Sequence, residues 1–197
     1  MNERWSTWAN VVTIVRLAAC MVIFGYARAE SDATWNLIGL GVYWVLDMAD
    51  GALARWLDQE TRIGAQLDIL ADRVLVAFFY FNYVVLYPHL LLPICLFLVQ
   101  FMFIDHYLSN QFMRWSVKSP NYFYEVDRTI WRWNWSPIAK AVNTAAVTLV
   151  LVVSKSAVMG TAVCAAMLVL KTWSVWRVAT LPEPERNWPV TPPASPP

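Results

Sequence analysis

Four aspartates lie in two hydrophobic stretches of this 197-residue chain, at spacings that place them in pairs. Asp47 and Asp50 are three residues apart and Asp68 and Asp72 are four apart, so each pair shares one helix face. The short connection 57–63 makes the two helices antiparallel neighbours and brings all four carboxylates to the same depth. Like charges this close cannot all stay ionised without cations among them, and oxygen ligands favour hard divalent ions. The pattern therefore predicts a site for Mg²⁺ or Mn²⁺.

Two other interpretations of these aspartates stay open. Arg55, Arg62 and Arg73 lie nearby in the sequence and would form structural ion pairs with them, although three cations cannot neutralise four carboxylates. Aspartates inside a membrane also line ion pathways, so a divalent-cation or proton transporter is the alternative from another functional class.

Small residues and a guanidinium accompany the first pair of aspartates. Gly51 follows Asp50 directly and Ala54 lies one turn later, which leaves room for the body of a ligand. Arg55 supplies a planar fork that suits phosphate. The chain contains neither a Gly-x-x-x-x-Gly-Lys loop nor a Gly-x-Gly-x-x-Gly turn, so a phosphate would be held through metal. Together these residues predict a diphosphate-binding site.

The elements that carry these residues are expected to cross a membrane. Hydrophobic residues make up 58% of the chain and charged residues 15%, whereas soluble domains have about 45–50% and about 25%. A net charge of +1 gives no electrostatic footprint for a nucleic acid. Windows long enough to span the hydrocarbon core are 9–27, 34–56, 64–86, 90–111, 138–154 and 157–177. The sequence thus predicts an all-α, polytopic integral membrane protein with six transmembrane helices.

The distribution of Lys and Arg predicts the orientation of these spans. Arg28 and Lys155 alone lie at one set of span ends, and the other basic residues near the ends gather on the opposite side. Both termini and the aspartates therefore face the cytoplasm. The first window is expected to be a retained helix rather than a cleaved signal peptide. Residues 1–178 are expected to form one membrane-embedded domain, and the Pro-rich segment 179–197 a disordered tail.

The stretch from Asp47 to Asp72 fits the signature D-x2-D-G-x2-A-R-x8-G-x3-D-x3-D at every fixed position. This signature resembles that of the CDP-alcohol phosphotransferase (CDP-alcohol phosphatidyltransferase) family, and the chain length and six-span layout are similar as well. The resemblance implies a transferase of phospholipid biosynthesis. Such an enzyme moves a substituted phosphate from a CDP-linked donor to an alcohol and releases CMP.

The resemblance also implies roles for individual residues. Two divalent ions would be held by Asp47, Asp50, Asp68 and Asp72, and Asp72 would also be the general base. The residues that would bind the CDP-linked donor are Gly51, Ala54, Arg55, Asn10, Thr13 and Arg16. The last three of these are similar to an Asn-x-x-Thr-x-x-Arg pattern at the start of the first span, but they also fit an ordinary interfacial helix start. Gly64 would allow close helix approach.

The identity of the alcohol is predicted from the residues around Asp72. CDP-diacylglycerol is the expected donor, because a site at the inner leaflet suits acyl chains. Ile69 and Arg73 replace the Pro and Lys that are common in glycerophosphate-using members, so the sequence is more similar to phosphatidylinositol synthase-type members. This favours inositol as the small polyol acceptor, with glycerol 3-phosphate or inositol phosphate as alternatives. The stretch 114–137 carries no motif that refines the choice.

Three further residues are candidates for contact with the acceptor. Asp105 and His106 lie in the fourth window, where they also fit a buried hydrogen-bonded pair. Lys140 starts the fifth window, where it would attract a phosphorylated acceptor or extend toward lipid headgroups. The resemblance is compatible with a homodimer, although no Gly-x-x-x-Gly face indicates one.

Overall fold

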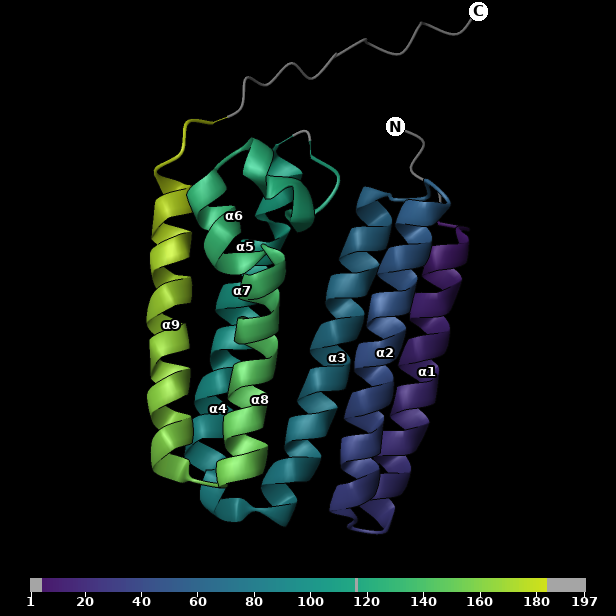
Figure 1. Ribbon diagram of the computed structural model, residues 1–197, viewed down its shortest axis with the longest axis vertical. Coiled ribbons are helices and arrows are strands. Elements are labelled where there is room, and N and C mark those ends of the chain that lie inside the picture. The colour runs from purple at the N-terminus through teal and green to yellow at the C-terminus, as the bar shows by residue number, and fades with distance from the viewer. Residues whose placement is uncertain (1–4, 116, 184–197) are drawn as a thin grey trace, which may run out of the picture.

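Long helices and columns of shorter helical segments stand side by side along one axis (Figure 1). The computed structural model describes residues 5–115 and 117–183, and within that part of the chain it contains no strand. The long helices are α1 (Trp8–Ala29), α2 (Ala33–Trp56), α3 (Arg62–Leu86) and α9 (Ala157–Ala179). The prediction of an all-α membrane protein is confirmed. Of the predicted tail 179–197, residues 184–197 lie outside the described residues.

Two columns are built from consecutive shorter segments. The first runs through η1 (Pro88–Leu90), α4 (Leu91–Val99), η2 (Gln100–Asp105), α5 (His106–Asn110) and η3 (Gln111–Arg114). The second runs through α7 (Pro137–Ala141), η5 (Val142–Ala146), α8 (Val147–Leu149) and η6 (Val150–Ser154). Within the described residues, five spans are long and apolar enough to cross a membrane: α1, α2, α3, the column Pro88–Arg114, and α9. The sixth predicted window, 138–154, is helical but divided, so the count of six stays a prediction.

The helices begin and end where the chain supplies side-chain caps. The Thr61 hydroxyl accepts a hydrogen bond from the Gly64 N–H at 2.9 Å and so caps α3. Asp32 caps α2 in the same way through the Thr34 N–H at 2.6 Å. Asp58 adopts a left-handed backbone with φ of 48°, which reverses the chain between α2 and α3. These ends make α2 and α3 antiparallel neighbours.

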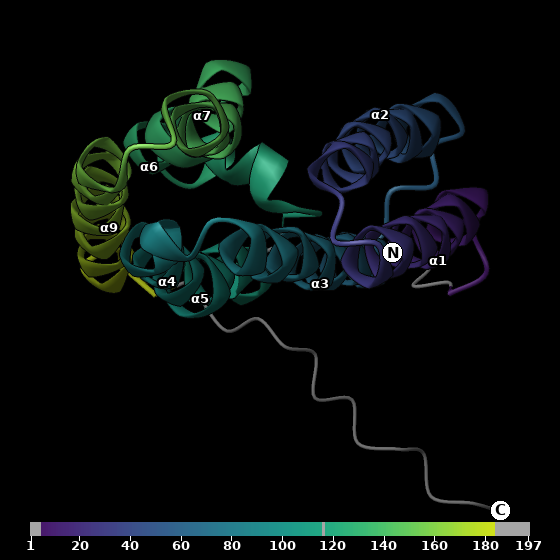
Figure 2. The ribbon, with the colours of Figure 1, turned by 90° about the horizontal axis from the view of Figure 1, so that it is seen from below.

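A core rich in aromatic residues packs the helices of the bundle together. It lies away from the end that the sequence predicts to be cytoplasmic. Phe24, Phe79, Tyr83 and Leu90 are almost fully buried in one cluster. Gly39 of α2 permits close contact there, because a Cβ atom at this position would lie 2.6 Å from the Phe24 ring. Seen from below, α1, α3 and α4 form one row, with α9 at the end opposite α1 (Figure 2).

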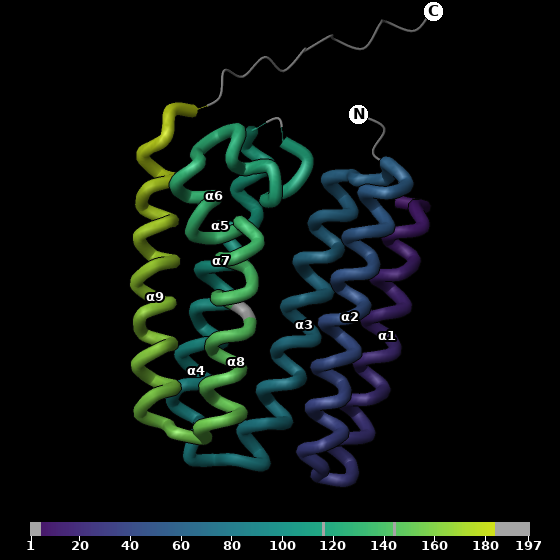
Figure 3. Tube along the Cα trace, in the orientation of Figure 1, coloured from purple at the N-terminus to yellow at the C-terminus, as the bar shows by residue number. Residues whose placement is uncertain are grey.

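A cap made of η4 (Pro120–Glu125) and α6 (Arg128–Asn134) lies at one end of the bundle (Figure 3). Arg62 at the start of α3 donates hydrogen bonds to the carbonyl oxygens of Met113 and Trp115 at 3.1 and 2.6 Å. The Tyr122 hydroxyl donates to the Glu60 carboxylate at 2.6 Å. The cap is therefore hydrogen-bonded to the turn that joins α2 and α3, the two helices that carry the signature residues.

Candidate functional site

The signature aspartates converge where α2 and α3 run side by side. Asp47, Asp50 and Asp68 each offer a carboxylate oxygen, and these oxygens all lie within 4.8 Å of one another. Asp72 lies one turn further along α3. Thr13 of α1 donates a hydrogen bond to Asp50 Oδ2 at 3.1 Å, so a third helix fixes the orientation of that carboxylate. The i, i+3 and i, i+4 spacings thus place their side chains as the sequence predicts.

Among the residues that the structure describes, Arg16 is the cation that forms ion pairs with these carboxylates. Its side chain is fully buried, with Nη2 lying 2.7 Å from Asp68 Oδ1 and 3.3 Å from Asp72 Oδ1. Nη1 forms an ion pair with Asp47 and lies 3.4 Å from Asp50 Oδ2. We call Arg16 and the four aspartates the acidic cluster. Structural ion pairing is therefore present, but through Arg16 of α1 rather than through the three arginines nearest in the sequence.

The acidic cluster has the chemistry of a divalent-metal site. One guanidinium balances a single carboxylate, so the ionised cluster keeps an excess of negative charge that burial makes costly. Asp72 Oδ1 is buried and accepts no hydrogen bond from the described residues. Oxygen ligands without sulfur or imidazole suit Mg²⁺ or Mn²⁺ rather than softer metals. The residues present fit such an ion.

A cavity of about 300 Å³ opens beside the acidic cluster. All four aspartates line it, and so do most residues predicted to bind the donor: Asn10, Thr13, Gly51, Ala54 and Arg55. Gly64, predicted to allow close helix approach, lines it as well. Gly64 has a specific steric role, because a Cβ atom there would lie 2.8 Å from Asn10 Oδ1 and 3.0 Å from Thr61 Oγ1. Arg16 differs from the expectation: it lies behind the carboxylates and is not among the lining residues.

Of the three residues predicted to contact the acceptor, two line the cavity and one does not. Asp105 and Lys140 both line the cavity. His106 is not among the lining residues, and its Nε2 lies 3.3 Å from the Asn110 side-chain amide. His106 faces away because it follows Asp105 directly, and neighbouring residues of a helix point about 100° apart. The expectation of a direct acceptor contact is therefore carried only by Asp105 and Lys140.

Sequence reasoning missed a second charged group in the same cavity. Lys171 of α9 and Arg73 of α3 both line the cavity and both contact Asp105, which lies at the end of η2. Arg73 had been weighed as a partner of the signature aspartates, whereas it pairs with Asp105. Lys171 is a lone basic residue inside the last apolar window, and intramembrane charges of that kind mark functional sites.

Comparison with known proteins identifies the family. A family model described as CDP-alcohol phosphatidyltransferase matches residues 6–173, which includes the acidic cluster and the whole cavity. The chain belongs to the CDP-alcohol phosphatidyltransferase family. This membership does not support the alternative interpretation of the aspartates as part of a transporter.

Similar proteins include named cardiolipin synthases. The chain is 34% identical over 80 residues to "Cardiolipin synthase (CMP-forming)" of Rattus norvegicus, covering 39% of this chain and 25% of that protein. It is 36% identical over 74 residues to "Putative cardiolipin synthase" of Mycobacterium tuberculosis (strain ATCC 25618 / H37Rv), covering 37% and 35%. The matches thus span only about a quarter to a third of these relatives. No solved structure matches.

Proposed function

We propose that this CDP-alcohol phosphatidyltransferase transfers a phosphatidyl group from CDP-diacylglycerol to a hydroxyl of a small polyol and releases CMP. The proposal rests on one observation above all: the four signature carboxylates converge at the wall of a cavity that α1, α2 and α3 line together. Family membership supports the same reaction class.

Different residues of the site have different roles in this reaction. Asp47, Asp50, Asp68 and Asp72 would hold two divalent ions. When bound, such ions neutralise charge on the diphosphate and on the leaving CMP. Asp72 accepts the proton of the attacking hydroxyl, whose oxygen forms the new bond to phosphorus while the bond from phosphorus to the CMP oxygen breaks. Gly51, Ala54, Arg55, Asn10 and Thr13 bind the donor, and Arg16 holds the carboxylates together between turnovers.

Two acceptors are candidates within this reaction. Inositol is the acceptor predicted from the residues around Asp72. A glycerol-containing acceptor is the second candidate, because the relatives that match are named cardiolipin synthases and cardiolipin contains a bridging glycerol.

The test uses the full-length protein, purified and reconstituted in lipid nanodiscs. It is incubated with CDP-diacylglycerol and inositol, glycerol 3-phosphate or phosphatidylglycerol, with Mg²⁺, with Mn²⁺ or with EDTA. We expect divalent-dependent release of CMP and a new lipid whose mass identifies the acceptor. Absence of CMP with every acceptor and both ions would contradict the proposal.

We also propose that the acidic cluster faces the cytoplasm, as the distribution of Lys and Arg predicts. Lys155 and Asp58 lie at opposite ends of the bundle and are both exposed. In a variant without native cysteines, a membrane-impermeant thiol reagent should label K155C but not D58C in intact cells. The reverse pattern would invert the orientation. The homodimer remains a prediction, which the oligomeric state of the same reconstituted sample would test.

A further inference from the structure

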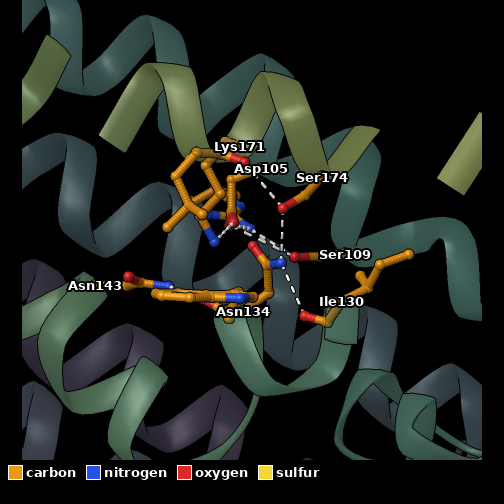
Figure 4. Close-up of polar contacts among 10 residues, drawn as sticks. Asp105, Ser109, Ile130, Asn134, Asn143, Lys171 and Ser174 are labelled. Atoms are coloured by element: carbon orange, nitrogen blue, oxygen red, sulfur yellow. Dashed lines mark hydrogen bonds and ion pairs between the residues drawn. The ribbon is translucent and has the colours of Figure 1, made fainter. Parts of the chain in front are cut away.

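A second buried charge cluster lines the same cavity as the four aspartates. Arg73 Nη2 and Lys171 Nζ each lie 2.6 Å from a different oxygen of Asp105. Ser109 lies beside them, and its hydroxyl is 3.3 Å from Arg73 Nη2. We call Arg73, Asp105 and Lys171 the basic cluster. Figure 4 shows Asp105, Lys171 and Ser109 together with Asn134 and Ser174, all gathered at one place between helices.

This basic cluster carries one more positive charge than its own carboxylate can balance. The side chains of Arg73, Asp105 and Lys171 are only 7%, 12% and 4% exposed, so water screens the excess charge poorly. Asp72, the neighbour of Arg73 in the sequence, also interacts electrostatically with Arg73, but its ion pair is with Arg16 in the acidic cluster, where it would hold the proposed metal ions. The basic cluster therefore lacks a full set of counter-charges.

Unused hydrogen-bonding groups in the same place point to a polar ligand. Arg73 is 6% exposed, yet its Nε and Nη1 have no hydrogen-bond partner among the residues that the structure describes. The Phe101 ring lies 3.8 Å from the Arg73 Cζ atom and fixes the plane of the guanidinium. Asn134 donates to Ser174 Oγ at 2.9 Å, while its own Oδ1 is buried and accepts nothing from the described chain. Arg73, Asn134 and Lys171 all line the cavity.

The position of the basic cluster separates it from the donor. The residues assigned to the donor lie on α1 and α2, whereas the basic cluster lies on α3, η2 and α9. Asp72, the proposed base, directly precedes Arg73 in α3 and is ion-paired with Arg16 of α1. An in-line displacement needs the attacking alcohol on the side of phosphorus opposite the leaving CMP. The basic cluster thus occupies the acceptor side of the cavity.

We infer that the acceptor alcohol carries a phosphate group, which Arg73 and Lys171 bind on the side of the cavity away from the donor. This inference rests on the proposed function. A phosphate would supply the missing negative charge and accept hydrogen bonds from the unused Arg73 nitrogens. Lys140, which is exposed and also lines the cavity, would attract it from solution. A free polyol such as inositol offers no such charge.

The first test compares acceptors on the reconstituted wild-type protein. We expect glycerol 3-phosphate or phosphatidylglycerol to be used with a KM at least tenfold below that of free inositol. Activity with the first indicates a soluble phosphomonoester, and activity with the second a lipid phosphodiester. Inorganic phosphate should compete with the acceptor but not with CDP-diacylglycerol. A lower KM for free inositol, or no competition by phosphate, would overturn the inference while leaving the proposed function intact.

The second test changes the basic cluster. Lys171→Met should raise the KM of the phosphate-bearing acceptor about tenfold or more, because a charged hydrogen bond is lost, and should leave the KM of CDP-diacylglycerol within about twofold of the wild-type value. Lys171→Arg should restore much of the loss. Lys155→Met is the matched control at the opposite end of the bundle. Equal changes in both KM values would show a structural role and overturn the inference. If Lys171→Met does not fold, the exposed Lys140→Met serves in its place.

No CMP release with any acceptor would refute the proposed function itself, and the inference with it. The two failures are thus distinguishable, because the inference alone fails only when CMP is released.

Discussion

The acidic cluster and the basic cluster of this protein are arranged in the same way, but their charges have opposite signs. In the acidic cluster four carboxylates surround one guanidinium, and in the basic cluster two cations share one carboxylate. Each central group orients its partners but leaves charge of the opposite sign in excess. The acidic cluster is thus suited to bind added cations and the basic cluster an added anion. A cavity between them fits a reaction that brings a metal-held diphosphate to an anionic alcohol.

The largest effect is expected from the acidic cluster. Asp72→Asn should keep the fold and reduce CMP release by about 10²–10⁴-fold, because the attacking hydroxyl loses its base. Initial rates with a saturating acceptor measure the effect. Asp58→Asn is the matched control, since Asp58 lies at the same end of the bundle with its side chain 94% exposed. Near-normal turnover in Asp72→Asn would remove the assignment of the base.

The second prediction distinguishes the two clusters by the added ion, Mg²⁺ or phosphate, that restores the thermal stability of a variant of each. Arg16→Met and Asp105→Asn each remove the central group of one cluster, and loss of one partner of a buried ion pair costs about 3–5 kcal/mol. Mg²⁺ should recover the thermal stability of Arg16→Met but not that of Asp105→Asn, which inorganic phosphate should recover instead. Thermal unfolding in detergent measures both.

The exposed Arg28→Met, at the other end of α1, is the control for this pair and should melt as the wild type does. If Mg²⁺ restored the thermal stability of both variants equally, the two clusters would not differ in the sign of their excess charge.

A smaller effect is expected from the glycine that brings α1 against α3. Gly64→Ala would place a methyl group 2.8 Å from Asn10 Oδ1, and overpacking of this kind costs about 1–3 kcal/mol. The KM of CDP-diacylglycerol should rise as well. Gly41→Ala is the matched control, because a Cβ atom there has no neighbour within 4 Å. Equal tolerance of both changes would show that Gly64 is not needed for close approach.

The smallest effect concerns the cap and involves no excess charge. The hydrogen bond to Glu60, followed by burial, raises the pKa of Tyr122 to about 12. Tyr122→Phe should lower the free energy of unfolding by about 1 kcal/mol. Since the folded pKa is raised, this contribution is complete below the unfolded pKa of about 10. It is lost as the pH rises toward 12. Chemical unfolding at pH 7 and pH 11 should therefore show a difference between the proteins that shrinks at high pH.

The sequence predicted the acidic side of the cavity far better than the basic side. The four aspartates lie within one short stretch on two consecutive helices, so helical periodicity and a short turn are enough to bring them together. Arg16 was placed near the donor, because only tertiary packing of α1 shows that it lies behind the carboxylates.

The basic cluster could not be predicted in the same way. Arg73, Asp105 and Lys171 come from three segments far apart in the chain, and no local spacing links them. Local sequence patterns also did not predict that the helical column 137–154 is divided into short segments, because its hydrophobicity resembles that of an unbroken span. Lone intramembrane charges were the available signal, but a lone charge does not reveal its partner.

Lys171 also has a consequence for how the chain is assembled in the bilayer. A lysine near the centre of an isolated helix opposes insertion by about 2.5–3.5 kcal/mol, and in the finished protein Asp105 offsets that penalty. The last helix is thus stable in lipid only after earlier segments have delivered their carboxylate. A protein truncated before α9 would conversely leave the Arg73–Asp105 pair without its second cation.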